Sequence, residues 1–140
     1  MTQAALLQRA RLHNALVMVT RRLSGLDGLS ESVRQQIRQT QVVAIARDLQ
    51  LFNTAALVMR ALREAGVEAM TYKGPVLWRA LGLSGPSKVS SDVDVIVRPD
   101  DLRNADAVLE GLGYRCVDMD PQRLHMASRT DRPSICIGTC

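Results

Sequence analysis

The chain has 140 residues, a formal net charge of +4, 46% hydrophobic residues and 23% charged residues. This composition is typical of one globular domain, or of a small domain with an attached helical layer. No apolar run is longer than about five residues, so we expect no membrane span. Aromatic residues make up only 3% of the chain, which is too few for a protein that holds single-stranded nucleic acid by base stacking.

The three cysteines, Cys116, Cys136 and Cys140, all lie late in the chain and form no CxxC pair. Their number and spacing predict neither a disulfide framework nor a structural zinc site, and such cysteine usage is typical of the cytoplasm. The positive charge is concentrated in residues 1–70, which hold nine basic and five acidic side chains, whereas residues 71–140 hold nine of each. This basic half either contacts phosphates or simply has a solvated surface.

Helical periodicity dominates the first half of the chain. Apolar residues recur at helical spacing over 3–23, which predicts a first helix there. Ser32 begins a capping-box pattern, and no Pro or Gly follows it until Gly66. We therefore expect one long helix, or two helices joined near Asn53, that end at Gly66.

After Gly66 the pattern changes to short strands that alternate with brief helices. The strand candidates are residues 67–73, 91–97, 114–117 and, later, 134–140, with helices expected over 74–81 and 102–112. The chain thus has helices first and a β-α-β-α-β order after them. This order predicts an α+β fold, with an N-terminal helical layer followed by a small mixed sheet. We accordingly divide the chain into a helical region, 1–66, and an α/β core, 67–140.

The most informative motif is Asp92-Val93-Asp94, inside the strand expected over 91–97. Side chains at i and i+2 leave the same face of a strand, so these two carboxylates stand together. Two carboxylates at such a short distance repel each other, so they require a bound cation or a proton on one of them. Mg²⁺ takes carboxylate oxygens and suits phosphate chemistry, and a pair of such ions can activate an attacking oxygen and hold a leaving pyrophosphate. Exposed strands also carry such pairs without a function.

Upstream of this pair, Tyr72-Lys73-Gly74 ends a strand and precedes a helix. Glycine in such a turn lets backbone N–H groups approach a phosphate, and Lys73 would add a positive charge beside a triphosphate. Lys-Gly is also a common turn in proteins of every kind. The two motifs together are therefore compatible with a nucleotide site.

Four segments, taken together, resemble one known family. They are Met70–Leu77, Lys88–Val97, Arg98–Leu102 and Gly111–Arg115. They contain a strand that ends in Lys-Gly, a basic residue before an Asp-hydrophobic-Asp strand, and a helix that ends in Gly-Tyr-Arg. In these features residues 66–116 are similar to the uncharacterised nucleotidyltransferase family of the DNA polymerase β-like superfamily. Relatives with the Lys-Gly turn include nucleotidyltransferases of bacterial toxin–antitoxin systems, whose sites follow an Arg-x-Ser-x-Asp-x-Asp pattern.

The resemblance implies transfer of a nucleoside monophosphate from an NTP to an acceptor hydroxyl, with pyrophosphate leaving. It implies that Asp92 and Asp94 are catalytic and bind two Mg²⁺ ions. The nucleotide-binding residues implied in the same way are Lys73, Gly74, Lys88, Ser90 and Ser91. Lys88 stands where the family often has Arg, which keeps the charge but loses the bidentate fork. The choice of NTP, and of RNA, protein, sugar or antibiotic as acceptor, stays open.

Two features depart from the family. Its enzymes usually carry a third carboxylate on a later strand, which completes the metal site, but residues 134–140 contain no acid. Asp118, Asp120 and Asp131 lie nearby without fitting the expected pattern. Residues 126–140 are also unlike the further sheet and helices of the family, so we interpret the core as incomplete at its C-terminus.

Two alternative functions follow from the residues. The missing third carboxylate favours a catalytically inactive, antitoxin-like interaction module on the same fold, which binds a protein partner or a second copy of the chain. The basic N-terminal half favours a helical RNA binder with steeply salt-dependent affinity. The side chains that such a binder would place on phosphates are Arg9, Arg11, Arg21 and Arg22. The enzyme hypothesis alone predicts metal-dependent NTP binding that requires Asp92.

Overall fold

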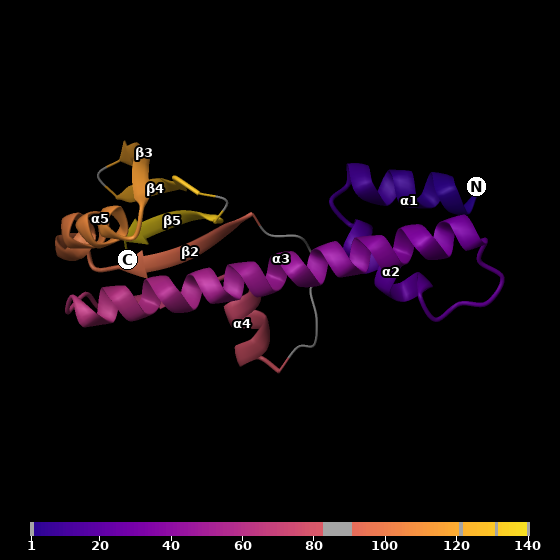
Figure 1. Ribbon diagram of the computed structural model, residues 1–140, viewed down its shortest axis with the longest axis horizontal. Helices are drawn as coiled ribbons and strands as arrows, with labels where there is room; N and C mark the ends of the chain where they lie inside the picture. Colours follow the sequence, from indigo (N-terminus) through magenta and orange to yellow (C-terminus); the bar gives the residue numbers. More distant parts are fainter. Residues whose placement is uncertain (1, 83–90, 121, 131, 140) are drawn as a thin grey trace. The chain divides into compact units, whose positions relative to one another are not determined.

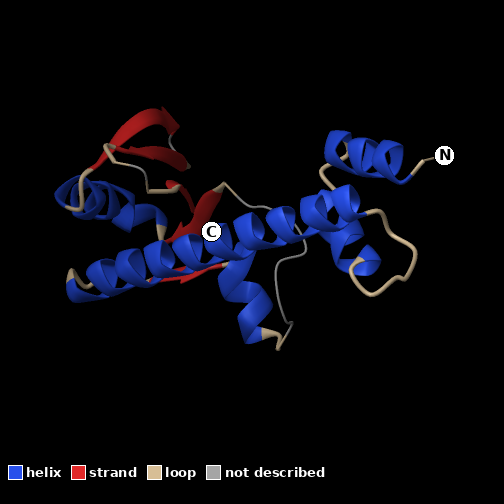
Figure 2. Ribbon diagram, turned by 45° about the vertical axis from the view of Figure 1, so that its right-hand side comes forward, coloured by secondary structure: helices blue, strands red, loops and turns tan. Residues whose placement is uncertain are grey.

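The computed structural model describes residues 2–82, 91–120, 122–130 and 132–139. Helices come first and five strands of one mixed sheet follow (Figures 1 and 2), which confirms the α+β fold expected from the sequence. The chain forms two compact units, an N-terminal one that contains residues 2–48 and a C-terminal one that contains residues 49–82 and the described residues from 91 onward. The separation into a helical region, 1–66, and a core, 67–140, stays a prediction.

Three helices build the N-terminal unit. They are α1 (Gln3–Leu12), α2 (Leu16–Leu23) and the first part of α3 (Glu31–Glu64). The single helix predicted over 3–23 is wrong, because the chain turns at Asn14, whose φ of 53° lies in the left-handed region. Asn adopts this conformation more readily than most residues because its short side chain can hydrogen-bond locally. The buried side chains of Leu7, Val33 and Ile37 form the small core of this unit.

Helix α3 is one uninterrupted helix and not two helices joined near Asn53. The cap predicted at Ser32 is wrong, because the hydroxyl of Ser30, directly before the helix, accepts the backbone N–H of Val33 at 3.4 Å. By length and composition alone, α3 could cross a membrane, with a mean hydropathy of 1.4 over 18 residues. The core helix of a soluble protein meets the same criterion, so the expected absence of a membrane partner stays a prediction.

The C-terminal unit consists of the sheet and the helices that connect its strands. Its elements are β1 (Ala69–Thr71), α4 (Gly74–Ala80), β2 (Asp92–Val97), the 3-10 helix η1 (Pro99–Asp101), α5 (Leu102–Gly111), β3 (Tyr114–Asp120), β4 (Arg123–Ser128) and β5 (Ser134–Thr139). The strand order is β1-β2-β5-β4-β3, in which β2 and β5 are parallel and the other neighbours antiparallel. Strand β4 was not predicted, whereas the other four strands lie where the sequence indicated.

One face of this sheet carries the hydrophobic core. Strand β2 buries Val93, Val95 and Val97 and leaves the residues between them partly exposed. Ile135 and Ile137 of β5 lie directly opposite Val93 and Val95 and are also buried. The helical residues that complete this core are Leu51, Ala55, Val58 and Leu62 of α3 and Ala105 and Leu109 of α5. Because the apolar side chains all face the helices, the polar side chains of the same strands share the opposite face.

Candidate functional site

The two carboxylates of β2 stand together on the face of the sheet that is turned away from the core. Asp92 and Asp94 are partly buried, and the alternation with buried valines is the one predicted from the sequence. Cys136 of the neighbouring strand β5 lies directly opposite Asp94. One ligand atom from each of these three side chains lies within 4.8 Å of the other two. The sequence analysis brought the carboxylates together correctly but did not include the thiol.

Asp92 accepts two hydrogen bonds from side chains. The hydroxyl of Ser91 donates to Oδ1 at 3.0 Å, and the thiol of Cys136 donates to Oδ2 at 3.3 Å. Burial raises the pKa of Asp92, but the hydrogen bonds from Cys136, Ser91 and the backbone N–H of Asp92, together with the charge of Lys73, outweigh it and leave this pKa below its ordinary value. Burial, and then the contact with Asp92, raise the pKa of the Cys136 thiol. At neutral pH the pair is therefore an ionised carboxylate beside a protonated thiol.

Lys73 reaches the same cluster from the turn that follows β1. Because β1 runs antiparallel to β2, the residues after β1 lie beside the beginning of β2. The Nζ atom of Lys73 lies 3.6 Å from Oδ1 of Asp94 and 4.6 Å from the centroid of the Tyr72 ring. The contact with Tyr72, and then the charge of Asp94, raise the pKa of Lys73. Its side chain is 59% exposed, so it is free to turn toward a bound anion.

Gly74 directly follows Lys73 and begins α4. Its φ of +71° lies in the left-handed region, and a Cβ atom built there would meet no other atom within 4 Å. The need for glycine therefore comes from the backbone conformation and not from a lack of space. The nucleotide-binding residues predicted at Lys88 and Ser90 lie outside the residues that the structure describes.

A recess of about 390 Å³ opens beside Asp92. Its lining is polar and comes from β2, the residue before β2 and the three strands beyond it. The lining residues are Ser91, Asp92, Asp118, Arg123, His125, Ser134 and Cys136. The sheet register explains this composition, because Cys136 lies opposite both Asp94 and His125, and His125 lies opposite Asp118. A continuous polar row thus crosses four strands of the sheet. The alternation of apolar and polar residues over 123–126 was the sequence signal for the missed strand.

A β-bulge brings Asp118 into this polar row. In a regular strand Asp118 would share a face with Cys116, which packs toward the core opposite the buried Met126. The register of β3 shifts between Cys116 and Asp118, so the extra residue, Val117, turns Asp118 to the other face. The recess therefore contains a carboxylate from a later strand that the sequence analysis set aside. The Asp120 side chain and Asp131 lie outside the described part of the chain.

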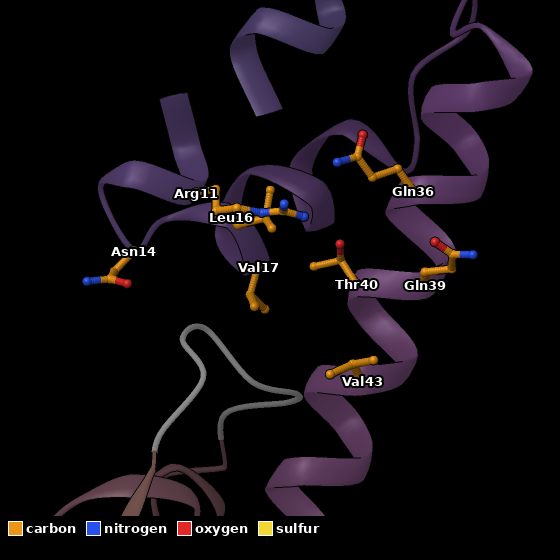
Figure 3. A pocket seen from close by; sticks show the side chains of 8 residues that line it. All are labelled: Arg11, Asn14, Leu16, Val17, Gln36, Gln39, Thr40 and Val43. Carbon is orange, nitrogen blue, oxygen red and sulfur yellow. The ribbon is translucent and has the colours of Figure 1, made fainter. Parts of the chain in front are cut away.

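The N-terminal unit contains a larger cavity, of about 520 Å³. Its lining residues are Arg11, Asn14, Leu16, Val17, Gln36, Gln39, Thr40 and Val43, which come from α1, α2, the turn between them and α3 (Figure 3). Among these residues Arg11 carries the only charge. The cavity therefore has amide and hydroxyl groups for hydrogen bonding, but none of its lining residues is a carboxylate that would hold a metal ion.

A family model of uncharacterised nucleotidyltransferases matches residues 2–135. The chain belongs to this family. The matched residues extend into both compact units, end within β5 and include every predicted site residue. The match confirms the family suggested by the motifs and gives the chain a nucleotidyltransferase-like function. No curated protein matches the sequence.

Proposed function

We propose that this nucleotidyltransferase transfers a nucleoside monophosphate from an NTP to an acceptor hydroxyl, with Asp92 and Asp94 as the Mg²⁺ ligands. The observation that carries the proposal is the cluster itself: two carboxylates share one strand face, and the ammonium of Lys73 lies 3.6 Å from Asp94. Carboxylates and a mobile cation in one place suit a metal-bound polyphosphate. In the reaction the acceptor oxygen bonds to the α-phosphorus, the bond to pyrophosphate breaks, and the hydroxyl proton leaves to solvent.

The carboxylates fit a hard divalent cation. The lowered pKa of Asp92 keeps this carboxylate ionised at neutral pH, as a ligand must be. When bound, Mg²⁺ would offset the negative charge of the phosphates and of the departing pyrophosphate. The polar recess beside Asp92 is open to receive an acceptor, and its Arg123 and His125 side chains offer hydrogen-bond donors there.

Lys73 and Gly74 would position the triphosphate. The ammonium of Lys73 pairs with Asp94, and we expect it to turn to a phosphate oxygen once a cation occupies the carboxylates. Gly74 gives the turn its left-handed conformation, which keeps the Lys73 stem beside the beginning of β2. Roles for Ser91, Lys88 and Ser90 in nucleotide binding, and a cytoplasmic location, belong to the same proposal.

Thermal-shift titration tests the proposal. Each NTP is added with and without Mg²⁺ to the wild type, to Asp92→Asn and Asp94→Asn, and to the control Asp100→Asn, which changes an exposed carboxylate in η1. An NTP at about 100 times its dissociation constant stabilises the fold by about 2.7 kcal/mol, which raises the melting temperature by about 5–10 °C at this chain length. We expect this shift to require Mg²⁺, to persist in the control and to disappear in both site variants.

Transfer itself is then measured with α-labelled NTP and a panel of acceptors, as pyrophosphate release together with label on the acceptor. The proposal is wrong if no NTP raises the melting temperature, or if the shift survives both site variants. Partner binding that ignores Asp92 and Asp94 would instead support the interaction module.

A further inference from the structure

We propose that Cys136 is the third ligand of the cation site, and that without nucleotide this site selects a thiophilic divalent cation of the zinc and cadmium class over Mg²⁺. The inference concerns the carboxylates of the proposed function and deepens it, but the binding event needs no nucleotide. Mg²⁺ would then enter the site together with the triphosphate, whose oxygens supply the ligands that the protein lacks. A zinc-class cation then competes with Mg²⁺–NTP for Asp92 and Asp94.

The distances fit such a ligand set. The sulfur of Cys136 lies 3.3 Å from Oδ2 of Asp92, and all three ligand atoms lie within 4.8 Å of one another. A thiolate sulfur and a carboxylate oxygen on the same tetrahedral zinc ion are about 3.6 Å apart. Small side-chain rotations therefore suffice to bring the three atoms around one ion.

The fold, and not a mobile loop, holds the ligands in place. Asp94 and Cys136 are direct neighbours on two parallel strands, and the strand residues on either side of Cys136 are fully buried in the core. Cys136 itself is only 7% exposed, so its thiol faces the carboxylates rather than bulk water. Two basic side chains must move when the cation arrives. The exposed Lys73 leaves Asp94, and the guanidinium of Arg123 leaves Cys136, to which it donates a hydrogen bond.

The donor types decide which cation is preferred. Thiolate sulfur binds zinc-class ions strongly, whereas Mg²⁺ prefers oxygen ligands and retains its water. When the cation binds, the Cys136 thiol releases its proton to solvent and loses its hydrogen bond to Asp92. One sulfur–metal bond replaces the S–H bond and this hydrogen bond. The third carboxylate that the family usually carries would have favoured Mg²⁺ instead.

Cadmium titration, followed by the ultraviolet charge-transfer absorption of a cadmium–thiolate bond, tests the inference directly. Cys140 is replaced by Ser in every sample, so that two thiols remain. Cys136→Ser removes the proposed ligand, and Cys116→Ser is the matched control, because the Cys116 thiol donates to the Asp118 carbonyl oxygen at 3.3 Å on the other face of the sheet. We expect the band in the parent and in Cys116→Ser, and its loss in Cys136→Ser.

Affinity for Zn²⁺ in competition with a chromophoric chelator gives the second readout. Loss of even an outer partner of a metal ligand lowers affinity about 10- to 100-fold, so we expect Cys136→Ser and Asp92→Asn each to weaken Zn²⁺ binding at least that much. A millimolar excess of Mg²⁺ should leave the cadmium band of the parent unchanged. Cys136→Asp should abolish the band and strengthen Mg²⁺ binding.

The inference is overturned if the parent shows no cadmium–thiolate band, if the band survives in Cys136→Ser, or if Mg²⁺ displaces cadmium. Because these measurements contain no NTP, their failure leaves the proposed function standing. Conversely, a positive cadmium result beside a negative NTP titration would identify a metal site in a protein that does not bind NTP.

Discussion

The two faces of the sheet are made by the same strands but differ completely in character. Toward α3 and α5, the strands present fully buried aliphatic side chains such as Val95, Ile135 and Ile137. On the other face, the residues between them include Asp94 and Cys136, and these meet around a polar recess. The period of two along a strand produces both faces at once. A cluster of carboxylates that would repel in isolation is thus held together by the packing of the face behind it.

The comparison teaches where stability and chemistry reside. The apolar face contributes the burial that keeps the register, and the register determines which polar groups become neighbours. A slip by one residue would exchange the two faces and bury both carboxylates. We expect substitutions on the two faces to differ in energetic effect as clearly as the faces differ in structure.

The largest expected effect is on the apolar face. Ile137→Ala removes a fully buried side chain opposite Val95, and such a truncation lowers the free energy of unfolding by about 2–5 kcal/mol. Met70→Ala is the matched control in the same sheet, because Met70 of β1 is 56% exposed and an exposed substitution changes stability by about 0.5 kcal/mol or less. Urea unfolding of both variants measures the difference. Equal losses would contradict a core confined to one face.

A smaller effect is expected at the turn that carries Lys73. Gly74→Ala places an L residue at a φ of +71°, which costs about 1–2 kcal/mol. Gly111→Ala is the control, because Gly111 ends α5 without a positive φ and Ala in a helix is more favourable than Gly by up to about 1 kcal/mol. The two substitutions should therefore shift the unfolding midpoint in opposite directions. A stable Gly74→Ala variant that binds NTP normally would show that the turn does not depend on glycine.

The sequence predicted the local features of the site well. The alternation of β2 already assigned Asp92 and Asp94 to one face, and Lys-Gly predicted the turn before α4. These features depend on neighbours in the chain, which periodicity and turn chemistry describe. The N-cap predicted at Ser32 was wrong and the break at Asn14 was missed, because competing local patterns differ there by small energies.

The non-local features of the site could not be predicted from the sequence. Cys136 meets Asp94 only because β5 pairs with β2 in one particular register, and no pattern within β5 specifies that partner. Asp118 joins the polar row because a single bulge in β3 changes its face. Strand β4 alternates clearly over 123–126, but residues 126–140, which include its end, were interpreted as a departure from the family. Strand order and bulges are thus what the structure adds to the site.

The smallest expected effect concerns the polar face and depends on pH. The pKa of Asp92 is lower in the folded chain than its ordinary value of 3.8, so the folded state favours the ionised carboxylate. The stability that this contributes is fully present above the ordinary pKa and is lost as the pH falls through the lowered folded pKa. We therefore expect Asp92→Asn to flatten the acid limb of the stability curve, measured as unfolding free energy against pH.

Ser91→Ala and Cys136→Ser separate the two side-chain hydrogen bonds that help to lower this pKa. Ser91→Ala removes the donor at 3.0 Å and should flatten the acid limb only in part. Cys136→Ser keeps a hydroxyl donor in place of the thiol at 3.3 Å, so its acid limb should stay close to that of the wild type. If Ser91→Ala instead matched Asp92→Asn, one hydrogen bond would account for the whole shift. In that case the acid sensitivity of Asp92 would come from its neighbour in the chain and would not depend on the strand pairing that brings Cys136 to Asp92.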